Sequence, residues 1–121
     1  MARIALIEDS SLMRTVFRQM LEKGGHVVEE WESGSAMEIL QYAERSHVDL
    51  LITDYKMPGA NGATVAKMAR KAKPTLPIIV ITSLRDAEVM EILQRCEVNA
   101  ILNKPCTEKE LLDLVAKTLG N

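Results

Sequence analysis

Residues 50–59 read LLITDYKMPG, and this stretch decides the fold. An apolar run over residues 50–52 ends at the carboxylate of Asp54, and Met-Pro-Gly at 57–59 then turns the backbone away. A short run of branched apolar residues closed by Pro-Gly is typical of a strand that is buried on both faces. We therefore expect Asp54 to lie where a central strand leaves the core, and to be the centre of a site if other strands end in polar groups beside it.

Length and composition indicate one globular domain over residues 1–121, because 121 residues can bury a hydrophobic core and 47% of them are hydrophobic. The net charge of −2 and the aromatic content of 3% give no basis for binding nucleic acid. No run is long enough to span a membrane, so no membrane partner is expected. Cys96 and Cys106 lack metal-ligand spacing and are interpreted as reduced thiols of a cytoplasmic protein.

Apolar runs recur along the chain and alternate with segments of helical periodicity. Strands are expected at residues 4–7, 26–31, 48–53, 77–81 and 98–102, the second polar enough for a sheet edge. A helix is expected after each strand. Four begin at the cap residues Ser10 or Ser11, Ser35, Asp86 and Thr107, and one begins at Asn61-Gly62. Alternation with short loops predicts an α/β protein with right-handed βαβ units and a doubly wound parallel sheet.

Polar side chains follow four of these strands: Glu8 and Asp9, Asp54, Thr82, and Lys104. In a doubly wound sheet, ligands bind beyond the carboxyl ends of strands, where the strand order reverses. If the order is 2-1-3-4-5, the first and third strands are neighbours at that point. Asp9 then lies beside Asp54, with Thr82 and Lys104 on the next strands.

Crowded carboxylates repel one another unless a cation lies among them, and hard oxygen ligands suit Mg²⁺. A metal, the Lys104 ammonium on the opposite side and the Thr82 hydroxyl would surround Asp54 with groups that suit a phosphoryl group. Asp54 would accept it as an acyl phosphate. The chain has no G-x-x-x-x-G-K-[ST] motif, which argues against a P-loop.

The sequence resembles the receiver domain of response regulators in two-component signalling, over essentially the whole chain. The motifs that carry the resemblance are, in order, Glu8 and Asp9, Asp54, Met-Pro-Gly at 57–59, Thr82, and Lys104-Pro105. The resemblance implies a flavodoxin-like (βα)5 fold with strand order 2-1-3-4-5. It also implies phosphoryl transfer to Asp54 from the phosphohistidine of a histidine kinase or phosphotransfer protein.

The resemblance further implies Mg²⁺ dependence, with Mn²⁺ as a substitute. The ligands would be Asp9, Asp54 and the backbone carbonyl of Lys56, with Glu8 acting through water. The Lys104–Pro105 peptide bond is expected to be cis, which is uncommon even for proline.

Three positions depart from the family pattern: Ile101 replaces a Tyr or Phe, Cys106 a Phe, and Glu97 a Gly. They lie near the family's usual output surface, which here is the helix from Asp86 to Cys96, the strand from Val98 to Leu102 and the helix from Thr107 to Leu119. The departures remove the aromatic residue that usually couples to the switch threonine and leave the chemistry at Asp54 intact.

Two other functions are weighed against a phosphorylation-controlled switch. One is a phosphorylation-independent interaction module with a receiver fold. The other is a phosphohydrolase of the haloacid dehalogenase type, which places a second Asp two residues after the nucleophile, where this chain has Lys56. We expect a stand-alone receiver that assists its own phosphorylation and dephosphorylation, although the sequence leaves open whether it is part of a longer regulator.

Overall fold

A computed structural model describes residues 1–120 and contains one parallel sheet of five strands in the order β2-β1-β3-β4-β5. The strands are β1 (Arg3–Ile7), β2 (Val27–Glu30), β3 (Leu50–Asp54), β4 (Ile78–Thr82) and β5 (Ala100–Asn103). The helices are α1 (Ser11–Lys23), α2 (Ala36–Arg45), α3 (Gly62–Ala72), α4 (Ala87–Arg95) and α5 (Glu108–Thr118). The predicted doubly wound α/β fold and the edge position of the second strand are confirmed.

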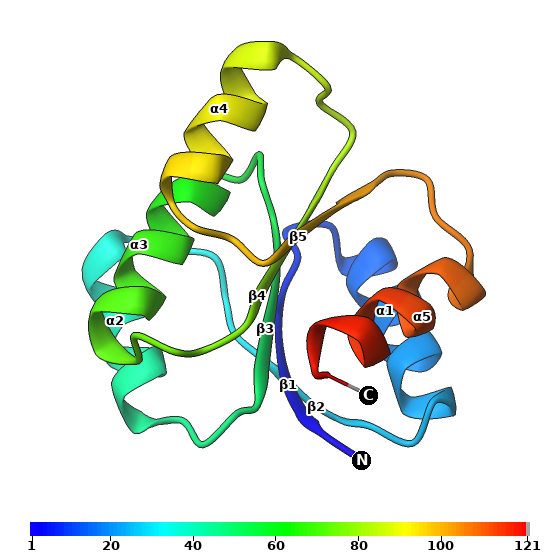
Figure 1. Cartoon of the computed structure of the whole chain (residues 1–121). Coiled ribbons are helices and arrows are strands. Elements are labelled where there is room, and N and C mark those ends of the chain that lie inside the picture. The colour runs from blue at the N-terminus through cyan, green and yellow to red at the C-terminus, as the bar shows by residue number, and fades with distance from the viewer. Residues whose placement is uncertain (121) are drawn as a thin grey trace.

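Helices cover both faces of the sheet, with α1 and α5 on one side and α2, α3 and α4 on the other (Figure 1). Phe17 of α1 and Leu111 of α5 belong to one buried cluster, and Ile39 of α2 and Leu93 of α4 belong to the other. Successive side chains of a strand alternate between faces. The sheet is covered on both sides, so every residue of an inner strand meets apolar surface, which explains the continuous apolar runs of the sequence.

Cap residues fix most helix starts as predicted. Ser35 and Thr107 form capping boxes, and the side chains of Ser10 and Asn61 each accept a backbone N–H of the first turn. Asp86 occupies the cap position of α4, but its side chain makes no cap hydrogen bond, so the predicted capping role is wrong. This end of α4 therefore lacks the side-chain cap that fixes the other four helices.

The fifth strand begins at Ala100, two residues later than predicted. Glu97 adopts a left-handed conformation with φ of 58°, and the Val98 N–H returns to the carbonyl of Leu93. The residues after α4 therefore form a helix-terminating turn before the chain joins the sheet. The other strand boundaries shift by one or two residues, as is usual at element ends.

The apolar side chains of α1 are only partly buried. Phe17 and Leu21 are buried and Met13 packs against the same cluster, but Leu12 is 71% exposed. Leu12 lies one residue from Met13, about 100° around the helix, and so faces away from the sheet. Among residues 1–120, no helix combines the length and apolar character that crossing a bilayer requires.

Candidate functional site

Sheet register brings the predicted site residues to one edge. Ile7 at the end of β1 pairs with Thr53 of β3, so the residues that follow, Glu8 and Asp54, emerge next to each other. On the other side of β3, Asp54 pairs with Ile81 of β4. The Lys104 N–H then donates to the carbonyl of Thr82, at 3.0 Å, where β5 ends. The sequence placed all of these residues at the correct end of the sheet.

The ammonium of Lys104 lies between two carboxylates. Its Nζ is 2.7 Å from Glu8 Oε1 and 3.1 Å from Asp54 Oδ2. The second oxygen of each carboxylate accepts a backbone N–H, from Ser10 at 2.9 Å and from Tyr55 at 2.8 Å. The sequence had placed Lys104 opposite the carboxylates, whereas the structure joins it directly to two of them and fixes both in orientation.

Asp9 differs from its neighbour Glu8. Glu8 is buried, with 3% of its surface exposed, and Asp9 is exposed. Within the part of the chain that the structure describes, no three acidic, histidine or cysteine side chains lie close enough together to hold a metal. The expected crowding of three carboxylates is thus reduced to two that share Lys104, because the ammonium supplies the cation that they need.

Burial is the main influence on the ionisation of Asp54. It raises the pKa of the carboxyl above its usual value, the hydrogen bond from Lys104 lowers it and the negative charge of Glu8 raises it further. Burial lowers the pKa of Lys104, but its hydrogen bonds to Glu8 and Asp54 outweigh that effect and raise it. Lys104 therefore carries a full positive charge at neutral pH, facing a half-buried carboxylate.

The donors at this edge suit a hard divalent cation. Asp54 is partly accessible, Asp9 is exposed, and the exposed Lys56 lies in the loop that follows Asp54 at the end of β3. Carboxylate and carbonyl oxygens with positions left for water are what Mg²⁺ prefers. The carboxylates of Glu8 and Asp54 share the single ammonium of Lys104, so a second cation would balance the remaining negative charge.

Thr82 lies one strand from Asp54 and is 2% exposed. Its Oγ1 accepts the N–H of Leu84 at 3.0 Å, which ties the start of the β4–α4 loop to the strand end. The hydroxyl hydrogen is left free to be donated, because the oxygen is the acceptor in this bond.

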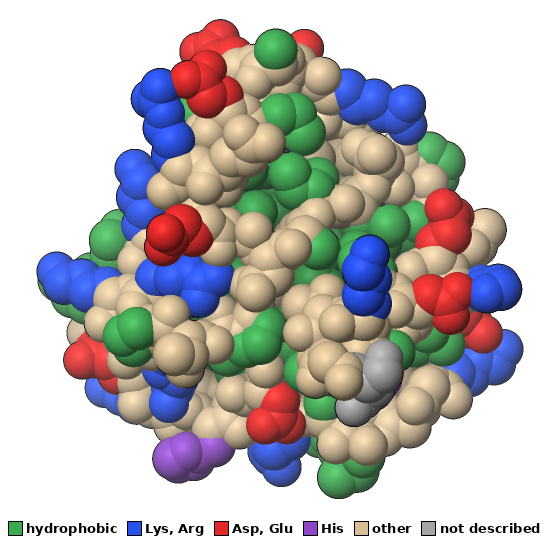
Figure 2. All heavy atoms as spheres, in the orientation of Figure 1, with side chains coloured by type: hydrophobic (Ala, Val, Ile, Leu, Met, Phe, Trp, Pro, Cys, Tyr) green, Lys and Arg blue, Asp and Glu red, His purple; other side chains and the backbone are tan. Residues whose placement is uncertain are grey.

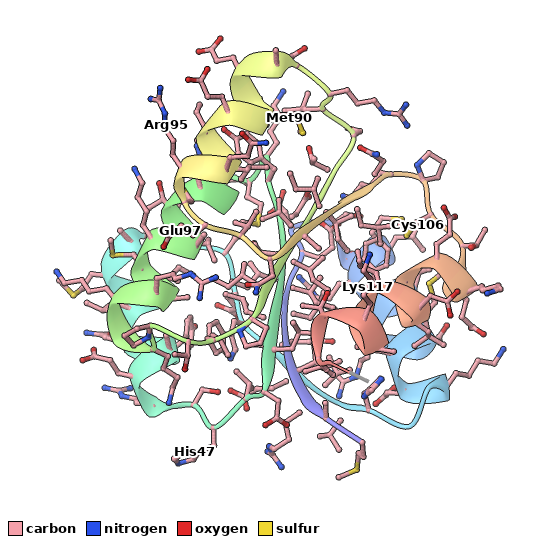
Figure 3. All side chains as sticks on the ribbon, in the orientation of Figure 1. His47, Met90, Arg95, Glu97, Cys106 and Lys117 are labelled. Carbon is pink, nitrogen blue, oxygen red and sulfur yellow. The ribbon has the colours of Figure 1, made fainter. Side chains whose placement is uncertain are left out.

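The departures from the expected family pattern lie around α4, β5 and α5. Glu97 lies where α4 ends, and Cys106 lies in the segment that leads into α5 (Figure 3). Ile101 is half-buried and packs against the core on the α4 side. Apolar side chains gather between α4 and the chain leading to α5 (Figure 2). The Lys104–Pro105 bond is cis, as expected.

Two arginines that the sequence did not single out make specific contacts. Arg70 of α3 donates to the carbonyl of Glu97 at 2.6 Å and to the side chain of Asn99 at 2.8 Å, which links α3 to the turn after α4. Arg14 of α1 donates to the backbone carbonyl of Glu8 at 2.9 Å. Both residues lie on helices where arginine is common, and neither has a spacing that reveals these partners.

Comparison with known proteins identifies the family. The sequence model of the response regulator receiver domain family matches residues 4–116 of the chain. The chain is 32% identical over 123 residues to a chemotaxis protein CheY homologue of Campylobacter jejuni, covering 98% of this chain and 92% of that protein. It is 30% identical over 110 residues to the cyclic di-GMP phosphodiesterase response regulator RpfG of Xanthomonas campestris, covering 89% of this chain. The chain spans 29% of RpfG and 24% of an NtrC regulator of Bradyrhizobium, so it matches only a part of these longer relatives.

Solved structures agree with this assignment. A CheY-like receiver domain protein of Methanospirillum hungatei superposes with a TM-score of 0.87 at 26% identity, covering 97% of this chain and 92% of the other. The receiver domain of the sensor histidine kinase PA1611 of Pseudomonas aeruginosa superposes with a TM-score of 0.86 at 24% identity, covering 99% and 98%, and it holds a magnesium ion in its active site cleft.

The fold, the charged edge of the sheet and these matches define a phosphorylation-dependent switch domain. The chain belongs to the family of response regulator receiver domains of two-component systems.

Proposed function

We propose that Asp54 accepts the phosphoryl group, from the phosphohistidine of a histidine kinase or phosphotransfer protein. The observation that carries this proposal is the Lys104 ammonium, held 3.1 Å from Asp54 Oδ2 and fixed by Glu8 on its other side. A carboxylate oxygen attacks phosphorus and the P–N bond breaks. The imidazole, which carries a proton on its other ring nitrogen, retains the electron pair and leaves as the neutral ring. Lys104 neutralises negative charge on the phosphoryl oxygens as the reaction proceeds.

Mg²⁺ is the proposed cofactor, with Mn²⁺ as a substitute. Asp9, Asp54 and the Lys56 backbone carbonyl would bind the ion directly, and Glu8 would act through water. The hard-oxygen donors, and the two carboxylates that share the single ammonium of Lys104, support this proposal. When bound, the metal neutralises charge on the phosphoryl oxygens.

The proposed output is a change at α4, β5 and α5 that an effector protein or an attached domain reads. Thr82 would turn its hydroxyl toward the phosphoryl group on Asp54, and Oγ1 would then release the N–H of Leu84 that it accepts in this structure. The β4–α4 loop would follow, with Ile101 filling the position where the family usually has an aromatic residue. We place this switch in the cytoplasm, where two-component phosphotransfer takes place.

The domain would also assist its own phosphorylation from small donors and its own dephosphorylation. Lys56 is exposed two residues after Asp54, and its side chain would lean over the phosphoryl group and limit the access of water. The lifetime of the phosphorylated protein should therefore shorten in Lys56→Ala. An unchanged lifetime would exclude this role.

The site of phosphorylation can be located directly. The protein is incubated with phosphoramidate and Mg²⁺, reduced with borohydride, which converts an acyl phosphate of aspartate to homoserine, and digested with trypsin. The peptide of residues 46–56 contains Asp49 and Asp54, which fragmentation distinguishes. We expect homoserine at position 54. Homoserine at position 49 or 9 would refute the assignment.

A further inference from the structure

Arg14 connects the acidic end of β1 to the rest of the fold. Its Nη1 donates to the backbone carbonyl of Glu8 at 2.9 Å, and its Nε lies 3.7 Å from Glu30 Oε1 at the end of β2. The side chain is 31% exposed, so the guanidinium is partly shielded by these partners. From the first turn of α1, Arg14 therefore contacts the residue that follows β1 and the last residue of the neighbouring strand β2.

Glu30 forms ion pairs with both Arg14 and Arg18. The second oxygen of Glu30, Oε2, accepts a hydrogen bond from Nη1 of Arg18 at 2.7 Å. The Nε of Arg18 also lies 3.4 Å from Oε2 of Glu22. Arg14 and Arg18 thus share one acidic partner, but only Arg14 reaches Glu8. Arg18 is therefore a suitable control for Arg14, because both arginines face Glu30 and only Arg14 contacts the backbone near the site.

The carbonyl that Arg14 binds belongs to the peptide unit joining Glu8 to Asp9. Because a peptide unit is planar, fixing the direction of this carbonyl also fixes the direction of the Asp9 N–H and the position of the Asp9 Cα. The Glu8 side chain is fixed separately, through Ser10 and Lys104. Asp9 is exposed, so its placement depends chiefly on the backbone that carries it.

We propose that Arg14 is a positioning residue: by holding the Glu8–Asp9 peptide it sets the Asp9 carboxylate for binding Mg²⁺. This inference rests on the metal site of the proposed function. Mutation of a group that orients a metal ligand without touching the metal typically weakens metal binding by about 10- to 100-fold. The positive charge of Arg14 acts in the opposite direction, because it repels a divalent cation. When the arginine is removed, loss of positioning therefore predicts weaker Mg²⁺ binding, whereas loss of its positive charge predicts tighter binding.

The test is the dissociation constant for Mg²⁺, measured by titration calorimetry on the unphosphorylated protein, for wild type, Arg14→Gln and Arg18→Gln. We expect Mg²⁺ to bind about tenfold more weakly to Arg14→Gln. Arg18→Gln removes the same charge from Glu30, and its dissociation constant should change by less than about twofold. The Asp9 amide resonance of the metal-free protein should shift in Arg14→Gln and stay in place in Arg18→Gln.

Equal or tighter Mg²⁺ binding by Arg14→Gln would overturn the inference and leave the metal site standing. Absence of Mg²⁺ binding by the wild type would instead overturn the metal site, and the inference with it. Arg14→Lys keeps the charge but loses the planar fork that reaches Glu8 and Glu30 together. Arg14→Lys should also weaken Mg²⁺ binding, and it replaces Arg14→Gln in the titration if Arg14→Gln does not fold.

Discussion

Lys104 Nζ lies 2.7 Å from Glu8 Oε1 and 3.1 Å from Asp54 Oδ2, so one ammonium joins the ends of β1 and β3 from the far side of the sheet. Lys104 follows β5, which is two strands away from β3. The contact reaches from the end of β5 across β4 to the ends of β3 and β1, and it neutralises part of the charge of the unphosphorylated site. A phosphoryl group on Asp54 would place new anionic oxygens next to the same ammonium.

The metal-free protein should be more stable as Asp54→Asn than as the wild type. Burial raises the pKa of Asp54, with Glu8 adding to it and Lys104 opposing it, so ionised Asp54 is less favourable in the folded than in the unfolded chain. The contribution of Asp54 to the free energy of unfolding is fully present at pH values below its pKa in the unfolded chain. It is lost as the pH rises through the higher pKa that Asp54 has in the folded chain. The neutral amide of Asp54→Asn avoids that loss at pH 7. The measurement compares the melting temperatures of the wild type and Asp54→Asn in EDTA. A lower melting temperature for Asp54→Asn would mean that the ion pair with Lys104 outweighs the burial.

Mg²⁺ should raise the melting temperature of the wild type in a concentration-dependent way, because a ligand that binds only the native state stabilises it. At a hundred times the dissociation constant the gain is about 2.7 kcal/mol. Asp9→Asn removes a proposed ligand and should reduce the rise, while Asp113→Asn, on the exposed face of α5, is the control. An equal rise in all three proteins would place the metal elsewhere.

Glu97→Gly should stabilise the protein. Glu97 has φ of 58°, a left-handed conformation that costs a residue with a Cβ about 1–2 kcal/mol and costs glycine little. Glycine loses some of this gain through the greater entropy of the unfolded chain, so we expect a net increase of about 1 kcal/mol in the free energy of unfolding. The measurement is urea unfolding.

The control for this variant is Glu91→Gly, within α4, which should destabilise by about 1 kcal/mol because glycine is unfavourable inside a helix. Loss of stability in Glu97→Gly would show that the Glu97 side chain itself contributes to the turn.

Stability should fall as the pH decreases below about 6.5, with a contribution from His26. Burial, with help from the N-terminal charge, lowers the pKa of His26 from its ordinary value of 6.5, and its Nδ1 accepts the N–H of Ala2 at 3.2 Å. The unfolded chain then binds the proton more readily, so stability present above pH 6.5 is lost as the pH falls through the lower folded pKa. His26→Gln should flatten this part of the profile of unfolding free energy against pH. An unaltered profile in His26→Gln would contradict this role of His26. His47→Gln, which changes an exposed histidine, is the matched control.

The fold could be predicted from the sequence because its signals are local. Apolar runs closed by polar residues located the strands, and Ser35 and Thr107 marked helix starts through capping-box spacing. The polar residues that end strands were predictable as a group, since parallel strands present their carboxyl ends at one edge.

Contacts between side chains distant in sequence could not be predicted in this way. The position of Lys104 between Glu8 and Asp54 depends on the reach of one flexible side chain across the sheet, and no spacing encodes it. The hydrogen bond from Arg14 ends on the backbone carbonyl of Glu8, and because every residue has such a carbonyl, the sequence does not indicate this contact. The exposure of Leu12 depends on how α1 is rotated against the sheet, which an apolar stripe defines only approximately.

The most direct test is intact-mass analysis of wild type and Asp54→Asn after incubation with phosphoramidate, with Mg²⁺ and with EDTA. We predict that the wild type gains the mass of one phosphoryl group only with Mg²⁺, and that Asp54→Asn gains none. The same adduct in Asp54→Asn would contradict the assignment of Asp54. No adduct on a wild type that binds Mg²⁺ would contradict the switch itself and favour a phosphorylation-independent interaction module.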